Sequence, residues 1–388
     1  MVSRSTRSTG LVLACGICLF SCNANAQSSK KTTFDGWDQD GNGFVTRAEF
    51  PKQLPAKNFD AADRNGDGKI SREEDEAYRS KLRQGRTRAG LPEGTTVHHD
   101  LTYETVGDRE LPLDLYLPKE AEESKQPLPL VIWIHGGGWK SGSKNGLGRC
   151  KTLLSHGYAL ASVEYRLSGE AIFPAAIEDC KAAVSYLRLN AKKYNLDPER
   201  FGAWGSSAGG HLVALLGMTN DIEDFNTHPV CKKASPAVQA VCNWYGPSDF
   251  LRMNDYPSNI DHDAADSPES QFIGGPIHDN KGKVARANPI THVSAGDPPM
   301  LLMHGDKDML VAFNQSELLY NALQKHKVES ELYKVAGGGH GFGGAKDSPQ
   351  ELVERCMKFF DKHLKQWTAA LAMSLINLRR HFILAQPA

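Results

Sequence analysis

The chain has 388 residues, with 45 Lys and Arg against 46 Asp and Glu, which gives a formal net charge of −1. This length is enough for one large domain and a smaller module. Because the charges balance and no basic run is interleaved with aromatic residues, nucleic acid is not an expected ligand.

Residues 1–26 have the pattern of a secretory signal peptide. Two arginines precede an apolar run over residues 11–20, and small residues at 24–26 offer a cleavage site. The run is too short to span a bilayer, and no later stretch reaches the ~18 to 20 apolar residues required. We therefore expect a secreted or periplasmic protein without a transmembrane segment. The alternative is lipidation at Cys22, because residues 19–22 loosely resemble a lipoprotein cleavage site.

Residues 32–80 contain two twelve-residue segments with the pattern of calcium-binding loops. In each, oxygen ligands recur at the coordinating positions and a glycine, Gly43 or Gly68, makes the sharp turn. The expected ligands of the first loop are Asp38, Asp40, Asn42, Phe44, Thr46 and Glu49. Those of the second are Asp63, Asn65, Asp67, Lys69, Ser71 and Glu74, where Lys69, like Phe44, acts through its carbonyl.

These segments resemble paired EF-hands, in which Val45 and Ile70 join the loops through a short two-stranded contact. A lone run of Asp, Asn and Gly is often only a solvated turn, but two complete matches favour Ca²⁺. Mg²⁺ is disfavoured because a flexible cage with a bidentate Glu suits the larger ion. The short spacing between the loops predicts a compact, small all-α module in which calcium is structural and binds with a Kd of about 10⁻⁴ to 10⁻³ M.

Residues 81–96 have the composition of a solvated linker, and strands and helices alternate after it. Strands are predicted at 99–103, 111–117, 128–134, 158–165, 200–204, 237–245, 299–303 and 331–335, and a helix at 174–191. This α/β alternation predicts a mostly parallel eight-stranded sheet covered by helices, with ligands bound beyond the carboxyl ends of the strands. The irregular stretch 253–292 predicts a lid or pocket wall.

Gly205-Ser206-Ser207-Ala208-Gly209 lies where a predicted strand turns into a helix. The two glycines permit a sharp turn that holds the Ser207 hydroxyl outward. Upstream, His135 and three glycines follow another strand. We assign the amides of Gly137 and Gly138, with that of Ala208, to an oxyanion hole for an ester carbonyl. The alternative is that both glycine clusters are only tight turns.

A serine nucleophile needs a histidine to take its proton and a carboxylate to fix the tautomer of that histidine. Asp308 follows the strand at 299–303 and His340 follows the strand at 331–335. The order Ser207, Asp308, His340 is that of α/β-hydrolases. Asp306 is a competitor for the role of the acid. Alternatively, these side chains cap helices or hold loops through backbone hydrogen bonds.

Residues 97–367 resemble α/β-hydrolase esterases of the hormone-sensitive-lipase and bifunctional feruloyl and acetyl-xylan esterase type. Besides the motifs above, the matching stretches are Tyr165-Arg166-Leu167, Phe173-Pro174-Ala175, Asp179-Cys180-Lys181-Ala182-Ala183 and Gly246-Pro247-Ser248-Asp249. The resemblance implies Asp308 as the acid, a serine esterase acting through an acyl-enzyme, and short acyl esters such as acetyl or feruloyl groups on polysaccharide as substrates. Trp139, where the lipase branch commonly has Phe, favours the carbohydrate-esterase branch and is a pocket candidate.

Two other functions stay open. A serine peptidase of the prolyl-oligopeptidase kind shares the fold and the triad order but usually needs a large accessory domain. The second open function is that of a calcium-dependent binding protein on an inactive hydrolase scaffold. An intact triad and a glycine-rich loop argue against this function. No cofactor is expected for catalysis.

Several further features are interpreted as structural. The close spacing of Cys231 and Cys242 suggests a disulfide. The pair His98-His99 and the loop Asp261-His262-Asp263 are interpreted as structural or solvated. The Ala- and Leu-rich tail 368–388 is predicted to be an extra helix packed on the body, with a surface-seeking helix as the alternative. The sequence leaves the oligomeric state open.

Overall fold

The computed structural model describes residues 33–52, 54–78, 90–121, 124, 126–220 and 222–365. By its contacts the chain divides into two compact units, 1–84 and 85–388, and each is described by itself. The predicted signal peptide 1–26 and the tail 368–388 lie outside the described residues. No helix in the described ranges combines the length and apolar character that crossing a membrane requires.

The first unit is built around a short antiparallel pair of strands. It contains α1 (Thr33–Trp37), β1 (Phe44–Thr46), α2 (Ala56–Ala62) and β2 (Lys69–Ser71), and residues 72–78 are helical. The predicted contact of Val45 with Ile70 is confirmed, since they are partners in the β1–β2 ladder. Both side chains are buried in a core completed by Phe34, Phe50, Phe59 and Ala62.

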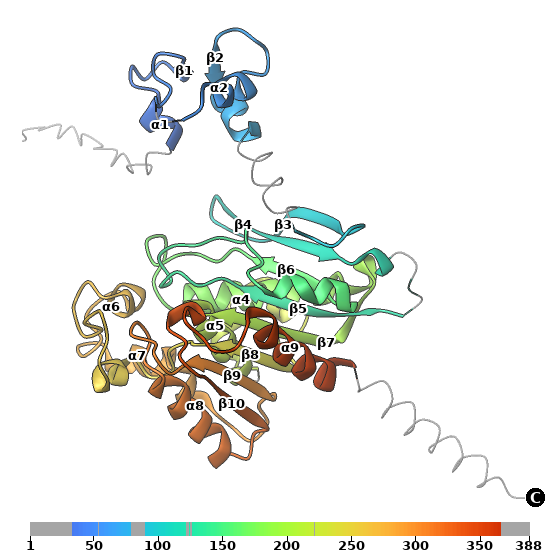
Figure 1. Cartoon of the computed structure of the whole chain (residues 1–388), viewed down its shortest axis with the longest axis vertical. Coiled ribbons are helices and arrows are strands. Elements are labelled where there is room, and N and C mark those ends of the chain that lie inside the picture. Colours follow the sequence, from blue (N-terminus) through green and yellow to red (C-terminus); the bar gives the residue numbers. More distant parts are fainter. Residues whose placement is uncertain are drawn as a thin grey trace, which may run out of the picture. The chain divides into compact units, whose positions relative to one another are not determined.

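An eight-stranded sheet forms the centre of the second unit, with the strand order β10-β9-β8-β7-β5-β6-β4-β3 (Figure 1). Only β4 runs antiparallel to its neighbours, so the prediction of a mostly parallel sheet is confirmed. The strands are β3 (Thr96–Val106), β4 (Arg109–Leu117), β5 (Leu128–Ile134), β6 (Ala159–Val163), β7 (Leu196–Ser206), β8 (Ala240–Trp244), β9 (Met300–Gly305) and β10 (Ser330–Val335). The first two are longer than predicted because they continue as one antiparallel hairpin.

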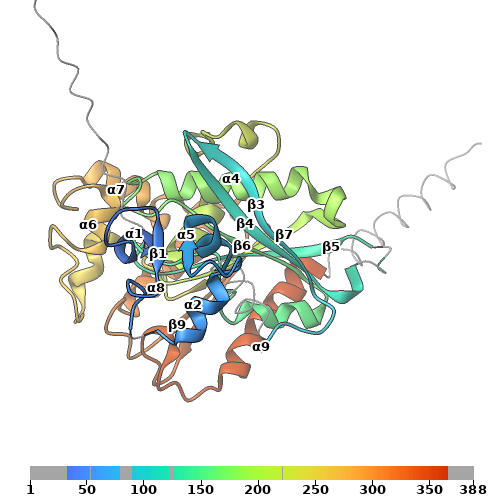
Figure 2. The same ribbon diagram turned by 90° about the horizontal axis from the view of Figure 1, so that it is seen from above.

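The sheet is covered on both faces, because alternate residues of its strands point to opposite sides. In β5, Leu130, Ile132 and Ile134 join one core cluster, whereas Val131 and Trp133 join another. The first cluster contains residues of α4 (Ala175–Leu189), α5 (Ala208–Met218) and α8 (Asn314–Lys325). The second contains residues of α9 (Pro349–Phe360) and of the 3-10 segment η2 (Cys150–His156). Figure 2 shows α4 and α9 on opposite sides of the strands.

The stretch 253–292, expected to be irregular, contains short helices. They are α6 (Pro268–Ile273) and α7 (Lys281–Ala287), flanked by the 3-10 segments η6 (Phe250–Asp255) and η7 (Pro289–His292). From the sequence, His262 is interpreted as structural or solvated. Only 1% of this residue is exposed, so the solvated alternative is wrong. Helices of one or two turns contain too few repeats of the apolar pattern to be recognised in a sequence.

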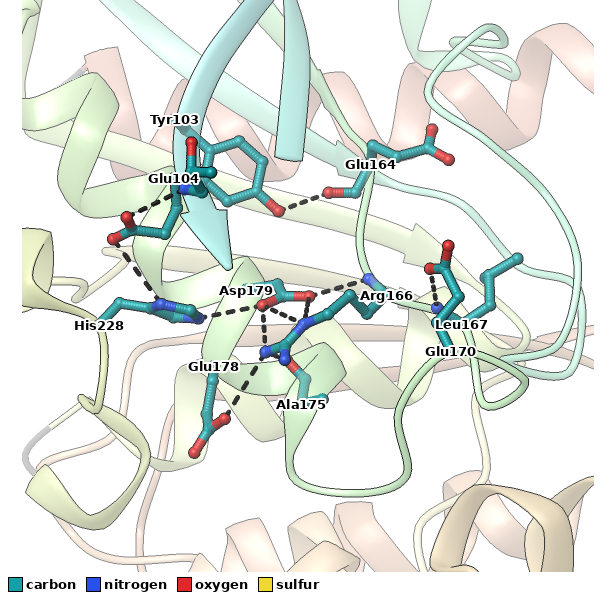
Figure 3. Close-up of polar contacts among 11 residues, drawn as sticks. Tyr103, Glu104, Glu164, Arg166, Leu167, Glu170, Ala175, Glu178, Asp179 and His228 are labelled. Atoms are coloured by element: carbon teal, nitrogen blue, oxygen red, sulfur yellow. Dashed lines mark hydrogen bonds and ion pairs between the residues drawn. The ribbon is translucent and has the colours of Figure 1, made fainter. Parts of the chain in front are cut away.

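A network of ion pairs joins β3, the segment after β6, α4 and the segment that contains His228 (Figure 3). The Arg166 guanidinium and backbone amide donate to Asp179 of α4 at 2.7 to 3.0 Å, and Nε2 of His228 lies 3.1 Å from the same carboxylate. Nδ1 of His228 in turn lies 3.7 Å from Glu104 of β3. Two residues after Arg166, the Ser168 amide donates to the carbonyl of Trp139. The network therefore supports the loop that follows β5.

The predicted Cys231–Cys242 disulfide is wrong. Both thiols are free, and they belong to the two core clusters on opposite faces of the sheet. Cys242 of β8 lies instead beside Cys356 of α9, with 3.4 Å between the sulfurs. Closeness in sequence was misleading because β8 places the Cys242 side chain on the α9 side.

Candidate functional site

Ser207 stands on the turn between β7 and α5 in a strained backbone conformation, with φ 56° and ψ −125°. A β-carbon added at Gly205 would lie 2.3 Å from the Gly209 carbonyl oxygen, and one at Gly209 would lie 2.1 Å from that of Ile134. Only glycine fits at either place, so the two glycines allow the turn to close tightly. This local geometry holds the serine at the carboxyl end of β7, next to β5.

The structure brings Ser207, His340 and Asp308 into one chain of contacts. Oγ of Ser207 lies 3.0 Å from Nε2 of His340, and Nδ1 of His340 lies 2.8 Å from Oδ2 of Asp308. His340 begins the 3-10 segment η8 (His340–Phe342), which follows β10 along the chain, and Asp308 follows β9. The Asp308 side chain is fully buried, whereas that of His340 is 25% exposed. This is the arrangement in which a hydroxyl can be deprotonated by an oriented imidazole.

The two candidate acids have different partners. Both oxygens of Asp308 are engaged: Oδ1 accepts the amides of Leu310 and Val311, and Oδ2 faces His340 and, at 3.4 Å, His304. Burial raises the pKa of Asp308, but the contacts with His304 and His340 outweigh burial and hold it well below its usual value. Asp306 instead accepts the amide of Gly337, which ties the ends of β9 and β10 together.

Two aromatic neighbours of the triad were not found from the sequence. His304, the last-but-one residue of β9, is fully buried against Asp308. The Tyr245 ring packs edge-on against His340, with 4.7 Å between ring centroids. Burial raises the pKa of Tyr245 to about 12, so its phenol stays neutral. The HG pair at 304–305 is a local signal that could have indicated His304; Tyr245 has none.

The glycines after β5 lie against the serine turn. A β-carbon at Gly136 would lie 2.7 Å from the Ser206 carbonyl oxygen. Gly137 and Gly138 have φ values of 115° and 58°, which favour glycine. In the described part of the chain, the amides of these two residues donate to no backbone carbonyl. Ala208 is the first residue of α5, where helix amides lack a helical partner. All three predicted oxyanion donors therefore have amides available to a ligand.

Trp139 is not a pocket residue, and that prediction is wrong. Its indole is 2% exposed, stacks on Phe272 and donates through Nε1 to Nδ1 of His211 at 3.2 Å. Burial lowers the pKa of His211 to about 4, so its ring is neutral and can accept this hydrogen bond. The positive φ of Trp139, 56°, accompanies a side chain placed in the core, which sequence position alone could not indicate.

In the first calcium-type loop, carboxylates of Asp38, Asp40 and Glu49 converge, with ligand atoms all within 4.8 Å of one another. Asn42 lies beside them, and its side chain contacts Asp40 at 2.7 Å. Thr46 donates its hydroxyl to Glu49, and Phe44 begins β1. These hydrogen bonds lower the pKa of Glu49, which therefore remains ionised. Hard oxygen donors of this kind fit Ca²⁺.

The second loop repeats most of the hydrogen bonds of the first. Asp63 accepts the amides of Gly66, Asp67 and Gly68, and Glu74 accepts those of Arg64, Asn65 and Ser71. Gly68 has φ 80°, as Gly43 has 85°. Lys69 begins β2, which pairs with β1, so its carbonyl and that of Phe44 occupy equivalent loop positions. The residues present fit a pair of calcium loops.

The parallel sheet, the strained serine turn and the triad-like contacts together define an α/β-hydrolase. A match to the BD-FAE family extends over residues 113–323, and the chain belongs to that family. A separate match to the EF hand covers residues 57–74, the second loop with the helix before it.

Two curated relatives each match somewhat more than half of the chain. The chain is 30% identical over 211 residues to "Probable carboxylic ester hydrolase LipM" of Mycobacterium tuberculosis, covering 53% of this chain and 47% of that protein. It is 28% identical to "Esterase LipC" of the same organism, covering 58% of this chain and 56% of that protein. The chain thus spans about half the length of the curated relatives it matches.

Solved structures give a longer overlap. A "Truncated form of carbohydrate esterase from gut microbiota" has 32% sequence identity and a TM-score of 0.62, covering 71% of this chain and 99% of that one. An "acetyl ester-xyloside bifunctional hydrolase" from Caldicellulosiruptor lactoaceticus has 26% identity and a TM-score of 0.57, covering 70% of this chain and 97% of that one. Both matches cover nearly the whole of the solved chain.

Proposed function

We propose that this protein is an exported serine carboxylic ester hydrolase that acts on short acyl esters. The observation that carries the proposal is the contact of Ser207 Oγ with His340 Nε2 at 3.0 Å, backed by Asp308 at 2.8 Å from Nδ1. The names of the relatives, which include carboxylic ester hydrolases and a carbohydrate esterase, support the same reaction class.

In the first half of the reaction, His340 takes the proton of Ser207 while Oγ attacks the ester carbonyl carbon. Asp308 fixes the tautomer of His340 with Nδ1–H toward Oδ2, which leaves Nε2 free to accept. The carbonyl oxygen becomes an oxyanion, toward which the amides of Gly137, Gly138 and Ala208 donate. Each such donor can supply about 3 to 4 kcal/mol of transition-state stabilisation.

In the second half, His340 returns its proton to the leaving alcohol, and the acyl group stays on Ser207. Water then enters, gives a proton to His340 and attacks the acyl carbon. Collapse of the second tetrahedral species releases the carboxylic acid and restores the Ser207 hydroxyl. No step requires a group beyond these side chains, the backbone amides and water.

We propose acetyl or feruloyl groups on polysaccharide as the substrate class. Support comes from the BD-FAE family match and from the carbohydrate-esterase and acetyl ester-xyloside hydrolase relatives. Turnover of acetylated xylan, methyl ferulate and a graded series of p-nitrophenyl acyl esters tests this. Preference for acyl chains of eight or more carbons, without turnover of the first two substrates, would contradict it.

The first unit is proposed to bind two structural Ca²⁺ ions through the two loops described above. The charge of the bound ions would offset the repulsion among converging carboxylates and fix the fold of the module. Export, proposed from the signal-peptide pattern of residues 1–26, would bring the protein to a compartment with ample calcium.

Replacing Ser207 by Ala tests the esterase proposal. We expect turnover of p-nitrophenyl acetate to fall about 10⁶-fold with the fold unchanged by circular dichroism. The wild-type chain should also be labelled at Ser207 by a fluorophosphonate, as an inactive scaffold would not be. Residual S207A activity within tenfold of wild type refutes the proposal, and cleavage of an Xaa-Pro nitroanilide without ester turnover would favour a peptidase.

A further inference from the structure

Two buried ionisable side chains lie in the segment between β8 and β9. His262 is 1% exposed and Glu269, in the first turn of α6, is 3% exposed. Nδ1 of His262 lies 3.1 Å from Oε2 of Glu269. Among the described residues neither of these two buried atoms makes a hydrogen bond of regular geometry, with the other or elsewhere, so their contact is an ion pair. Each is therefore the other's polar neighbour.

The other side of the His262 ring contacts the loop of the triad acid. Nε2 lies 3.0 Å from the Leu310 carbonyl oxygen and 3.1 Å from Oγ of Ser258. The Leu310 amide, on the same residue, donates to Oδ1 of Asp308 at 2.9 Å. One residue thus links the His262 ring to the carboxylate that orients His340.

Through Glu269, the pair also connects to the glycine loop after β5. Pro268, the residue before Glu269, packs against this loop: a β-carbon at Gly138 would lie 3.4 Å from Cβ of Pro268. Ser267 fixes the start of α6 by accepting the Ser270 amide. The two candidate halves of the catalytic machinery, the oxyanion loop and the acid loop, therefore meet across this ion pair.

The contacts favour a His262 ring with hydrogen on both nitrogens, because the Leu310 carbonyl can only accept from Nε2 and the Glu269 carboxylate faces Nδ1. If only Nε2 carried it, the Nδ1 lone pair would face the Glu269 carboxylate; if only Nδ1 did, the Nε2 lone pair would face the Leu310 carbonyl. Among the described residues, the charged groups that chiefly act on the ring are acidic: Glu269 from α6, and Asp261 and Asp263 from its own loop. Burial lowers the pKa of His262, but Glu269 outweighs it and the net shift is upward.

We propose that protonated His262, held by Glu269, is a positioning residue that keeps the Asp308 loop and the oxyanion loop in catalytic register. This inference rests on the esterase function proposed above and adds a proton-dependent link to it. Loss of the His262 proton breaks one of the two contacts, so turnover declines at alkaline pH.

Three single substitutions in the full-length protein test this. H262Q offers one amide group and cannot serve both partners, so kcat for p-nitrophenyl acetate should fall at least tenfold. E269Q can donate its amide to a neutral Nδ1, so both contacts survive without the extra proton. The matched control is H278Q, which removes an exposed histidine of the same segment that pairs with Asp263 at 2.8 Å.

The readout is kcat from pH 6 to pH 10 at 25 °C, after subtraction of spontaneous hydrolysis and with folding verified by circular dichroism. Wild type and H278Q should share an alkaline decline that E269Q lacks. If the pair were merely structural, H262Q and E269Q would lower the unfolding temperature but leave kcat and its pH profile unchanged. The inference is overturned if E269Q keeps the same decline, if wild type shows none up to pH 10, or if H262Q retains kcat within twofold.

Failure of the proposed function is distinguished by the wild type itself. If wild type does not hydrolyse esters, the pair is tested by unfolding temperature alone. A histidine whose pKa is raised on folding stabilises below its unfolded pKa of about 6.5 and loses this stabilisation as pH rises through the folded pKa. The difference in unfolding temperature between wild type and H262Q should then shrink from pH 6 to pH 10, and a constant difference overturns the ion pair.

Discussion

Nε2 of His304 lies 3.4 Å from Oδ2 of Asp308, the oxygen that also contacts His340 at 2.8 Å. Nε2 of His304 must carry hydrogen because it also lies 2.8 Å from the Val311 carbonyl oxygen, which can only accept. Nδ1 then accepts the Ser316 hydroxyl at 2.7 Å. A second imidazole thus contacts the same carboxylate oxygen as the candidate catalytic histidine.

Replacing His304 by Phe keeps an aromatic ring but removes this N–H donor. We expect kcat for p-nitrophenyl acetate to fall about 10²-fold, because a carboxylate freed to rotate displaces His340 by a fraction of an ångström or more. The control is H326N, which alters an exposed histidine after α8 and should change nothing. Activity of H304F within threefold of wild type would mean that the other partners of Asp308, His340 and the amides of Leu310 and Val311, suffice to hold it.

The glycines of the serine turn should tolerate no side chain. A β-carbon at Gly209 would lie 2.1 Å from a backbone oxygen, so G209A must displace β5 or α5. Destabilisation of about 1 to 3 kcal/mol or more is expected in urea unfolding, together with loss of turnover. At Gly282 of α7 nothing lies within 4 Å, so G282A should stabilise by about 0.5 to 1 kcal/mol. Equal stability of the two variants would contradict this account.

The ion network of Figure 3 gives a prediction about stability. Asp179 is fully buried, and D179N leaves the Arg166 charge without its carboxylate, which should cost about 3 to 5 kcal/mol in urea unfolding. Its neighbour Glu178 touches the same guanidinium only at 3.8 Å and is partly exposed. E178Q should therefore cost less than about 1 kcal/mol. Similar losses in both variants would show that charge alone, and not burial, decides the effect.

Contacts with His228 and Arg166 outweigh burial and lower the pKa of Asp179. A carboxyl whose pKa is depressed on folding stabilises above its unfolded pKa, and this stabilisation is lost as pH falls through the folded pKa. The stability gap between wild type and D179N should therefore be widest near neutral pH and narrow in acid.

Calcium titration of the full-length protein tests the first unit. Isothermal calorimetry should detect two sites with Kd values of about 10⁻⁴ to 10⁻³ M. E49Q and E74Q each remove the last ligand of one loop and should each abolish one binding event. Glu73, exposed and adjacent to Glu74, is outside the ligand pattern, so E73Q should bind as wild type. Two intact sites in E74Q would rule out the second loop as a calcium site.

Features with local sequence signatures could be predicted. The glycines around Ser207, the strand before each candidate catalytic residue and the oxygen-rich pattern of the two loops are all encoded within a dozen residues. The sheet itself followed from alternating strands and helices. The structure adds the distances that bring Ser207, His340 and Asp308 together.

Features set by long-range packing could not be predicted. His262 sits in a polar run, and only folding brings Leu310 and Glu269 to its two sides. Cys242 faces Cys356 across more than a hundred residues of sequence, so spacing pointed to the wrong partner. Trp139 follows the glycine loop directly, yet its backbone conformation accompanies a ring packed on Phe272. Each depends on which face of an element a side chain occupies in three dimensions.

The left-handed backbone of Ser207, at φ 56°, implies a trade-off between durability and reactivity. A side chain in this conformation is held there at an energetic cost of order 1 to 3 kcal/mol, which the surrounding turn must absorb. Glycine would relieve that cost, so S207G should melt at a higher temperature than the native chain and, if the proposed mechanism holds, should not hydrolyse esters. The native sequence keeps the less durable residue at the one position where the proposed reaction needs a hydroxyl.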